Sequence, residues 1–327
     1  MSGKNVIFAV ANILNVCENT NFSIIKIYKR QDNMSDKPLK FAFFGNEYQA
    51  RKSAAMQKIV ALLSQHGAQI YIDRPFYEFL TDGQHLDIDV AGVFDNDDFN
   101  ADFAVSMGGD GTLLRTASRV GHKHIPVFGV NVGRLGFLAD VNPTEMERAI
   151  ATIYSGDYTV NEHSVLQIEV EGKTIRTVPY AINDVAVLKR DTASMISVRA
   201  SVNGEYLMTY QADGLIVTTP MGSTAYSLSN GGPIIAPNAD ILCLTPVAPH
   251  SLNVRPIALS DDSVISLKVE SRSHNFLVAI DGRSESFPEG TLITIRKADY
   301  RIRIVRFSGR SYFATLREKM TWGVDHR

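Results

Sequence analysis

The run Val105-Ser106-Met107-Gly108-Gly109-Asp110-Gly111-Thr112 joins an apolar segment to a helical one through a turn that contains three glycines. The apolar residues 101–107 predict a buried β-strand, and residues 112–120 have helical periodicity that stops at Gly121. A strand followed by a tight turn and a helix is the repeating unit of α/β domains. The run therefore predicts a parallel sheet with a strand that ends at Met107.

The composition of this turn suits a site that meets a phosphate group. Glycine allows close backbone approach, so amide N–H groups can point at an anion, and the following helix offers its positive N-terminal end. A carboxylate such as Asp110 would repel phosphate unless it accepts a proton or faces Mg2+. The alternative is that Asp110 is only the N-cap of the helix. The spacing matches neither GxGxxG nor a Walker loop. The predicted phosphate-binding loop consists of Gly108, Gly109, Gly111 and Thr112.

The segments around this turn continue the α/β pattern. Strands are predicted at residues 39–44, 68–73 and 126–132, and a helix at residues 50–66 that ends at Gly67. A further helix is predicted to start at Asn142-Pro143-Thr144 and to end at Gly156. We assign residues 38–160 to an α/β N-terminal domain with a mainly parallel, Rossmann-like sheet, and residues 1–37 to a dispensable extension.

Beyond about residue 160, apolar and polar residues alternate, as in half-buried strands. Asn203-Gly204 is a strong hairpin signal. Strands are predicted at residues 165–170, 181–188, 196–202, 207–211, 215–218, 264–269, 276–280, 292–296 and 301–307. This pattern predicts a C-terminal all-β domain over residues 161–307.

Two further segments carry polar residues in unusual places. The block from Asp213 to Pro233 is rich in hydroxyls and glycines and contains one tyrosine, which suits a nucleoside pocket, although a polar connection with a helix capped at Thr224 explains it equally well. The pair Asn183-Asp184 interrupts an apolar strand. Neighbouring side chains in a strand point to opposite faces, so one of the two must point inward and needs a ligand or a partner, unless the strand kinks at the surface.

The bulk composition excludes several classes of function. The 327 residues carry a formal net charge of -2, so there is no overall basic field for nucleic acid or anionic lipid, and we expect neither partner. Cys17 and Cys243 lack the spacing of a structural metal site, and His122 and His124 are expected to be solvated loop side chains, so we predict no metal ligands in the chain. A cytoplasmic location fits this cysteine usage.

From about residue 39 to the end, the sequence resembles the NAD kinase family. The resemblance is carried by the glycine run, by Asn183-Asp184 and above all by the block from Asp213 to Pro233. Pro249-His250-Ser251-Leu252, Arg255-Pro256, Asp281-Gly282 and Leu316-Arg317-Glu318-Lys319 add to it. It implies a two-domain fold in which residues 308–327 return to the α/β domain, and a homodimer or homotetramer. It also implies transfer of the γ-phosphate of ATP, carried with Mg2+, to the 2′-hydroxyl of the adenosine ribose of NAD.

The resemblance also implies roles for individual residues. Asp110 matches the proton acceptor, Gly111 and Arg115 match contacts to the dinucleotide, and Asp213 matches a contact to the nicotinamide-side nucleoside. Asn183 and Asp184 match ligands of nucleotide hydroxyls or amides. The adenosine pocket is matched by Thr224, Ala225, Tyr226, Ser227 and Ser229, with Gln211, Leu228 and Ala248 as further NAD contacts.

Three positions depart from the family pattern. Met221 stands where threonine is common, Arg283 where glutamine is frequent, and Ser194 where a basic or aromatic residue is common. These departures bear on fine nucleotide contacts, such as NAD against NADH. The rival hypotheses are a lipid kinase, because diacylglycerol and sphingosine kinases share the glycine motif, and a dinucleotide-sensing protein without enzymatic activity.

Overall fold

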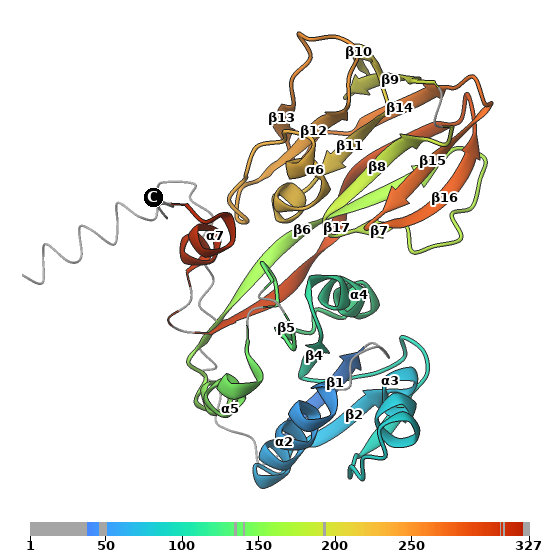
Figure 1. Cartoon of the computed structure of the whole chain (residues 1–327). Helices are drawn as coiled ribbons and strands as arrows, with labels where there is room; N and C mark the ends of the chain where they lie inside the picture. Colours follow the sequence, from blue (N-terminus) through green and yellow to red (C-terminus); the bar gives the residue numbers. More distant parts are fainter. Residues whose placement is uncertain are drawn as a thin grey trace, which may run out of the picture.

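The computed structural model describes residues 38–45, 51–133, 136–139, 141–191, 194–307, 309 and 311–322. Figure 1 shows an α/β part and a β part that two long strands connect. The predicted extension, residues 1–37, lies outside the described residues. Its dispensability and the predicted domain bounds stay predictions.

The α/β part contains a parallel sheet with the spatial order β5-β4-β1-β2-β3. Its strands are β1 (Lys40–Gly45), β2 (Gln69–Asp73), β3 (Gly92–Phe94), β4 (Phe103–Met107) and β5 (Val127–Val130). Alternate side chains of β1 enter different core clusters, Phe41 and Phe43 on one side and Ala42 and Phe44 on the other. Burial on both faces explains why these strands are apolar runs.

Helices cover both faces of this sheet. They are α2 (Arg51–Gln65), α3 (Arg74–Glu78), α4 (Asp110–Val120) and α5 (Met146–Ser155), with short turns η1 (Phe79–Gly83), η2 (Gly121–Lys123) and η3 (Pro143–Glu145). Met56 of α2 and Ile150 of α5 belong to the cluster of Phe41, whereas Leu113 of α4 belongs to the cluster of Ala42. The predicted start at Asn142 is confirmed by a capping box with Glu145, and Gly156 ends α5 in the left-handed region.

The β part is a sandwich of two sheets. Strands β6 (Tyr158–Val170) and β17 (Leu292–Phe307) form a long antiparallel ribbon, and β17 also pairs in parallel with β5, which joins the β part to the parallel sheet. The first sheet continues through β14 (Ile265–Glu270), β9 (Ile196–Val202) and β10 (Glu205–Ala212), with β7 (Tyr180–Ala181) beside β6. The second sheet has the order β13-β12-β11-β8-β15-β16. Its strands are β8 (Asp184–Lys189), β11 (Gly214–Thr218), β12 (Ile241–Val247), β13 (Ile257–Ser260), β15 (Asn275–Ile280) and β16 (Arg283–Pro288).

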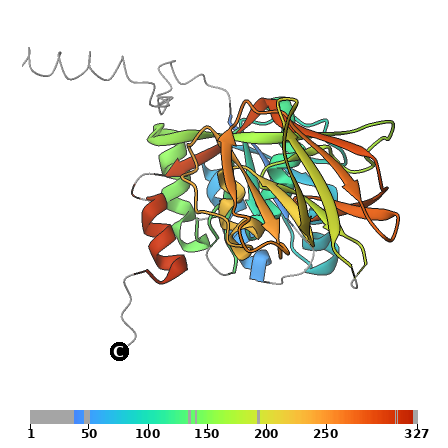
Figure 2. The ribbon, with the colours of Figure 1, turned by 90° about the horizontal axis from the view of Figure 1, so that it is seen from above.

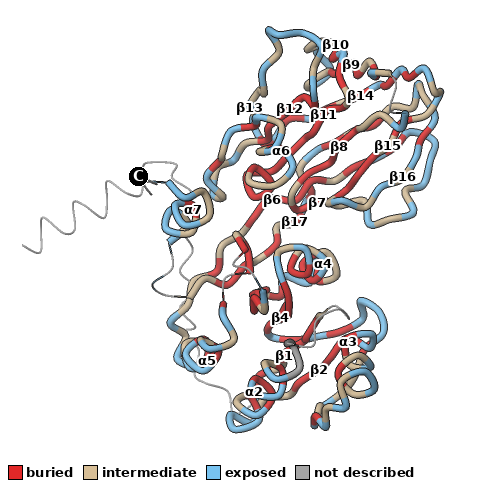
Figure 3. The backbone as a smooth tube through the Cα atoms, viewed as in Figure 1, coloured by how far each residue is buried: buried red, intermediate tan, exposed pale blue. Residues whose placement is uncertain are grey.

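One apolar core holds the two sheets together. Leu267 and Ile293 from the first sheet share a cluster with Val187, Val217 and Phe276 from the second. Figure 3 shows the buried residues running along β6, β8 and β11. The remaining elements are η4 (Met221–Thr224), α6 (Tyr226–Ser229) and α7 (Tyr312–Met320), and Figure 2 shows α7 at the side of the β part. In the described part of the chain, no helix is long and apolar enough to cross a membrane.

The predicted fold class is confirmed, and single strands differ from their predictions. The predicted strand at residues 181–188 is broken between β7 and β8, and the two strands predicted at 292–296 and 301–307 are one strand with an irregularity between Lys297 and Arg301. The hairpin at Asn203-Gly204 is confirmed, with positive φ at both residues. Strands β3, β12, β13 and β16 were not predicted.

A pair of matched substitutions tests the packing of the parallel sheet. Leu63→Ala removes a side chain of α2 that is 1% exposed, and we expect it to lower the free energy of unfolding by about 2–5 kcal/mol. Leu252→Ala removes one that is 87% exposed, and we expect a change within about 0.5 kcal/mol. Urea denaturation measures both. Equal losses for the two variants would contradict the described core.

Candidate active site

The glycine run lies where the strand order of the parallel sheet reverses. Strands β1 and β4 are neighbours, and their paired ends are Gly45 and Met107. The turn after Met107 therefore opens at the carboxyl edge of the sheet, at the topological switch point where open α/β sheets bind ligands. Figure 1 shows α4 between this edge and the β part.

The carboxylate of Asp110 holds a loop of the chain. Its Oδ1 accepts the backbone N–H groups of Leu138 (3.0 Å) and Ala139 (2.9 Å), and its Oδ2 accepts that of Phe137 (2.8 Å). A Cβ atom at Gly136 would clash with Asp110 Oδ1, so only glycine lets the loop come this close. Because a carboxylate offers about four acceptor positions, the bonds from described residues leave one position open on Oδ2.

The alternative interpretation of Asp110 as an N-cap is wrong. Helix α4 begins at Asp110, and its N-cap residue is Gly109. The carboxylate of Asp110 bonds to residues 137–139 instead of the first turn of α4. Its role is therefore to join the start of α4 to a distant loop.

The predicted phosphate-binding loop divides into an exposed and a buried part. Gly109 and Gly111 are exposed, and a Cβ added to either would meet nothing within 4 Å, so their backbone is open to a ligand. Gly108 and Thr112 are buried, and a Cβ at Gly108 would clash with the Thr112 hydroxyl. Arg115, exposed on α4, lies one turn after Gly111 on the same side of the helix.

Several hydroxyl groups of the block from Asp213 to Pro233 form hydrogen bonds with other groups of the protein. Thr218 Oγ1 donates to the carbonyl of Asn183 (3.0 Å), Thr219 Oγ1 donates to that of Ile182 (2.6 Å), and the hydroxyl of Ser227 bonds to that of Thr245 (2.8 Å). A Cβ at Gly222 would clash with the Asn183 carbonyl. The small residues thus let chain segments pack closely, in addition to any room that they leave for a ligand.

The exposed remainder of the block lies in η4 and α6. Tyr226 is 40% exposed, Ser229 is exposed, and Thr224, Ala225 and Leu228 are half-buried. Ser227 is fully buried, so its side chain faces Thr245 and not the surface. The alternative of a helix capped at Thr224 is wrong, because α6 begins at Tyr226 after Ala225 and has no side-chain cap.

Asn183 and Asp184 lie at the break between β7 and β8. As predicted, one of them points inward: Asp184 is 7% exposed, and burial and then the charge of Asp281 raise the pKa of its carboxyl to about 7. Asn183 Oδ1 is buried and has no hydrogen-bond partner among the described residues. The break is held by Asp281, whose carboxylate accepts the backbone N–H groups of residues 182–184.

Apolar packing brings these pieces into one place. Leu113 of α4, Leu138 of the loop bound to Asp110, Ile182 and Met221 belong to one buried cluster. A cavity of about 10 Å³ adjoins it, lined by Phe137, Leu138, His163, Pro220, Met221, Thr224, Pro237, Arg306 and Tyr312. Burial lowers the pKa of His163 to about 4, so this side chain is neutral at pH 7. The start of α4, the break at Asn183 and the segment η4 therefore form one candidate site.

Three predicted site residues lie apart from this group. Strand β11 pairs with β8 from Thr218, opposite Asp184, to Gly214, opposite Leu188. Four residue steps at about 3.3 Å separate these ends by about 13 Å. Asp213 lies beyond the far end, where it pairs with Lys189 at 2.7 Å. Gln211, bonded to Ser197, and Ala248, with a φ of 42°, lie near Asp213.

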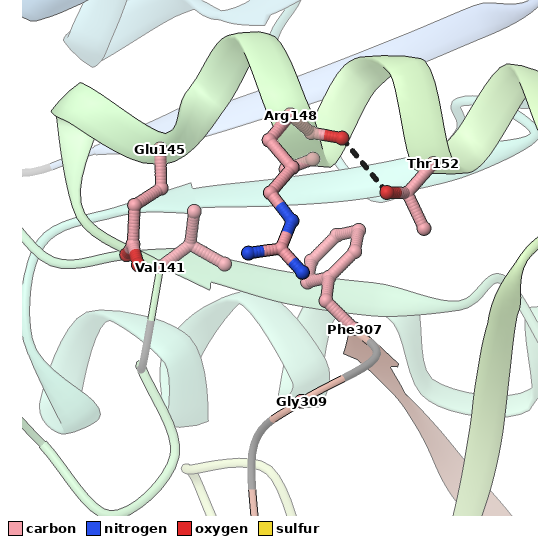
Figure 4. Close-up of a pocket in the computed structure, with 7 residues that line it drawn as sticks. Val141, Glu145, Arg148, Thr152, Phe307 and Gly309 are labelled. Atoms are coloured by element: carbon pink, nitrogen blue, oxygen red, sulfur yellow. Dashed lines mark hydrogen bonds between the residues drawn. The ribbon is translucent and has the colours of Figure 1, made fainter.

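A separate cavity lies beside α5. It has a volume of about 290 Å³, and none of the predicted site residues lines it. Figure 4 shows the side chain of Arg148 lying over Phe307 in this cavity. Glu145, the last residue of η3, lies beside the cavity just before α5 begins. Its lining residues are Val141, Glu145, Arg148, Ala149, Thr152, Phe307 and Gly309.

Two groups that shape the site were not predicted from the sequence. The loop 136–139 carries no motif, since it contributes backbone N–H groups to Asp110. No hairpin was predicted at Asp281-Gly282, although this pair is a hairpin signal of the same kind as Asn203-Gly204. Both missed groups act through contacts between residues that are distant in the sequence.

Comparisons with known proteins agree with this architecture. Residues 41–158 match the family model of the ATP-NAD kinase N-terminal domain, and residues 182–307 match that of the ATP-NAD kinase C-terminal domain. An NAD kinase of Bacteroides fragilis is 56% identical over 289 residues, which cover 88% of this chain and 100% of that protein. An NAD kinase of Porphyromonas gingivalis is 44% identical and covers 88% of this chain and 99% of its own length.

Solved structures show the same fold. The crystal structure of yeast NADH kinase complexed with NADH superposes with a TM-score of 0.80 at 23% identity and covers 89% of this chain and 90% of its own. That of an NAD kinase from Archaeoglobus fulgidus in complex with ATP gives 0.68 at 26% identity, with coverages of 86% and 99%. With both domain models matched and relatives of this identity, the chain belongs to the NAD kinase family.

Proposed function

We propose that this chain transfers the γ-phosphate of ATP to the 2′-hydroxyl of the adenosine ribose of NAD, with Asp110 as the proton acceptor. Its family membership gives the reaction. The assignment of Asp110 is carried by one observation: its Oδ2 keeps an open acceptor position beside the exposed backbone of Gly109 and Gly111. No second function is favoured by a specific feature of the described residues.

Catalysis of this phosphoryl transfer depends mainly on the positions of the reacting groups, and less on covalent participation of the protein. The 2′-hydroxyl oxygen attacks the γ-phosphorus, the bond from that phosphorus to the β,γ-bridging oxygen breaks, and ADP leaves with this oxygen. The hydroxyl proton passes to Asp110 Oδ2. Because three backbone N–H groups fix the carboxylate, its open position has a defined direction. Such placement supplies most of the rate gain in phosphoryl transfer.

The groups next to Asp110 suit phosphate. The backbone of Gly109 and Gly111 is open, and α4 has eleven residues, so its N-terminal end presents a partial positive charge to an anion. Arg115, exposed one turn later, carries a full positive charge, and we assign it to the dinucleotide, as the resemblance implies. We assign the triphosphate of ATP to this end of α4.

The β part supplies contacts for the dinucleotide. Asn183 Oδ1 is a buried acceptor that a hydroxyl or amino group of a nucleoside would satisfy, and leaving such an atom unpaired costs about 1–3 kcal/mol. Tyr226 offers a partly exposed ring for the adenine base. We assign the adenosine half of NAD to Asn183, Asp184 and residues 224–229.

Magnesium is proposed to enter as part of the ATP substrate. In the part of the chain that the structure describes, no group of three or more His, Cys, Asp or Glu side chains could hold a metal ion. Mg2+ is usually bound through substrate phosphates and one or two carboxylates, which is the basis for proposing an ion that ATP carries. We further propose a cytoplasmic location, in keeping with the buried free thiol of Cys243.

The separation of the predicted NAD contacts supports an oligomer. Gln211, Asp213 and Ala248 lie beyond one end of the β8–β11 pairing, and Asn183 lies at the other. We propose a homodimer or homotetramer in which Gln211, Asp213 and Ala248 of one copy face the dinucleotide bound by a neighbouring copy. A symmetric assembly gives each site both groups.

Sedimentation equilibrium tests this assembly. We expect a mass of two or four times 36.1 kDa at micromolar concentration. A mass of 36.1 kDa under conditions where the enzyme is fully active would contradict it.

Replacement of the carboxylate tests the proton acceptor. We expect Asp110→Asn to lower kcat at saturating NAD by a factor on the order of 100 or more, because asparagine lacks the basic oxygen. An assay with ATP, Mg2+ and NAD, coupled to an NADP-specific dehydrogenase, measures this.

Asp102→Asn is the matched control, since that carboxylate also accepts a backbone N–H, from Lys40 at 2.8 Å, at the other edge of the sheet. Near-normal turnover of Asp110→Asn would refute the assignment. Phosphorylation of a diacylglycerol, or NAD binding without ATP consumption, would favour the rival functions.

The raised pKa of Asp184 predicts a pH-dependent stability. Its carboxyl titrates at about 7 in the folded chain, against an ordinary value of 3.8, so the folded state binds a proton that the unfolded state has lost between these values. The contribution of Asp184 to the free energy of unfolding is therefore largest at low pH, and it falls as the pH rises toward 7. We expect the unfolding free energy of the wild type to fall, relative to Asp184→Asn, by on the order of 2 kcal/mol from about pH 5 to about pH 8. Parallel curves for the two proteins in urea denaturation would count against burial of the charge.

A further inference from the structure

The tip of the β15–β16 hairpin reaches the break between β7 and β8. Ile280 pairs with Arg283, so Asp281 and Gly282 form a two-residue loop, and both have positive φ, as a type I′ turn requires. The N–H of Asp281 donates to the carbonyl of Asp184 at 3.0 Å. The hairpin thus places the side chain of Asp281 beside the start of β8.

The carboxylate of Asp281 binds three successive N–H groups there. Its Oδ2 accepts from Ile182 (2.8 Å), and its Oδ1 accepts from Asn183 (2.8 Å) and Asp184 (3.2 Å). In a regular strand, successive N–H groups point to opposite sides, so one carboxylate cannot bind three of them. The broken conformation and the carboxylate therefore depend on each other, because the N–H groups need this partner when they are buried.

This arrangement sets the direction of the candidate nucleoside ligands. The backbone N–H of Asn183 donates to Asp281. The backbone carbonyl of Asn183 accepts from Thr218 Oγ1 and from the N–H of Thr219 (2.9 Å). The backbone of Asn183 is thereby fixed from two sides. Its side chain, whose Oδ1 has no hydrogen-bond partner in the described part of the chain, is left to meet a ligand.

The next residue of the hairpin reaches the other half of the site. Arg283 lies with Nη1 at 3.4 Å from Ser118 Oγ of α4, and its Nη2 donates to the carbonyl of Tyr180 (3.2 Å). Helix α4 begins at Asp110. The hairpin tip therefore contacts both the segment of Asn183 and the helix that carries the proposed proton acceptor.

We propose that Asp281 is a positioning residue for the dinucleotide. Its carboxylate holds residues 182–184 in the conformation that presents Asn183 and Asp184 to NAD, and it acts through them. This inference rests on the proposed function, since it concerns the acceptor substrate of the same site.

The test separates binding of NAD from chemistry. Asp281→Asn keeps the size of the side chain but places an amino group opposite one of the N–H donors. We expect the KM and the calorimetric Kd for NAD to rise about 10- to 100-fold, because loss of the hydrogen bonds that Asn183 and Asp184 would make to the ligand weakens binding by about this factor. The KM for ATP and the kcat at saturating NAD should stay within about threefold. Asp102→Asn, the backbone-binding carboxylate at the other edge of the sheet, should leave both KM values unchanged.

Other outcomes are equally decisive. A folded Asp281→Asn with an unchanged Kd for NAD overturns the proposal, as does a loss of kcat at unchanged KM, which is the sign of a merely structural residue. If Asp281→Asn does not fold, Gly282→Ala replaces it: the φ of 80° disfavours alanine, a Cβ there meets nothing within 4 Å, and the displaced tip should raise the KM for NAD in the same way. A wild type that makes no NADP would defeat the proposed function itself, whereas an active wild type with an unaltered variant defeats only this inference.

Discussion

The three hydrogen bonds from residues 137–139 to the carboxylate of Asp110 are the interaction on which the rest of the site depends. They tie the first residue of α4, which follows β4, to a loop that follows the neighbouring strand β5. The same loop supplies Leu138 to the cluster that contains Met221 of the β part. The carboxylate therefore sets the position of the glycine turn and links it to the segment that we assign to adenosine.

The same device recurs on the other side of the site. Asp281 binds three successive N–H groups at residues 182–184, as Asp110 does at residues 137–139. In both cases a carboxylate from one element fixes an irregular stretch of another, and a glycine, Gly136 or Gly282, allows the geometry. The two cases differ in the group that is available to a ligand. At Asp110 it is the carboxylate itself, through Oδ2, whereas near Asp281 it is the side chain of Asn183, whose Oδ1 has no partner among the described residues.

Most of the fold could be predicted from local patterns, and much of the site could not. The glycine run after an apolar strand predicted the parallel sheet and the edge at which Asp110 lies, because both depend on neighbouring residues. The sequence placed an interruption at Asn183-Asp184, but whether the strand breaks there could not be decided, since the break depends on Asp281, which is 98 residues away. The hydroxyls of Thr218, Thr219 and Ser227 belong to the block that suits a nucleoside pocket, and each of them also bonds to a partner in the chain. Sequence type alone does not distinguish a hydroxyl that binds a ligand from one that holds a turn.

A crystal structure of the wild-type chain with NAD bound would test the central claim most directly. We expect the adenosine 2′-hydroxyl within about 2.6–3.2 Å of Asp110 Oδ2, with the N–H groups of residues 137–139 still on the carboxylate. A 2′-hydroxyl with no path to Asp110, directly or through one water molecule, would contradict it. So would a carboxylate that has left the loop and points away from the ribose.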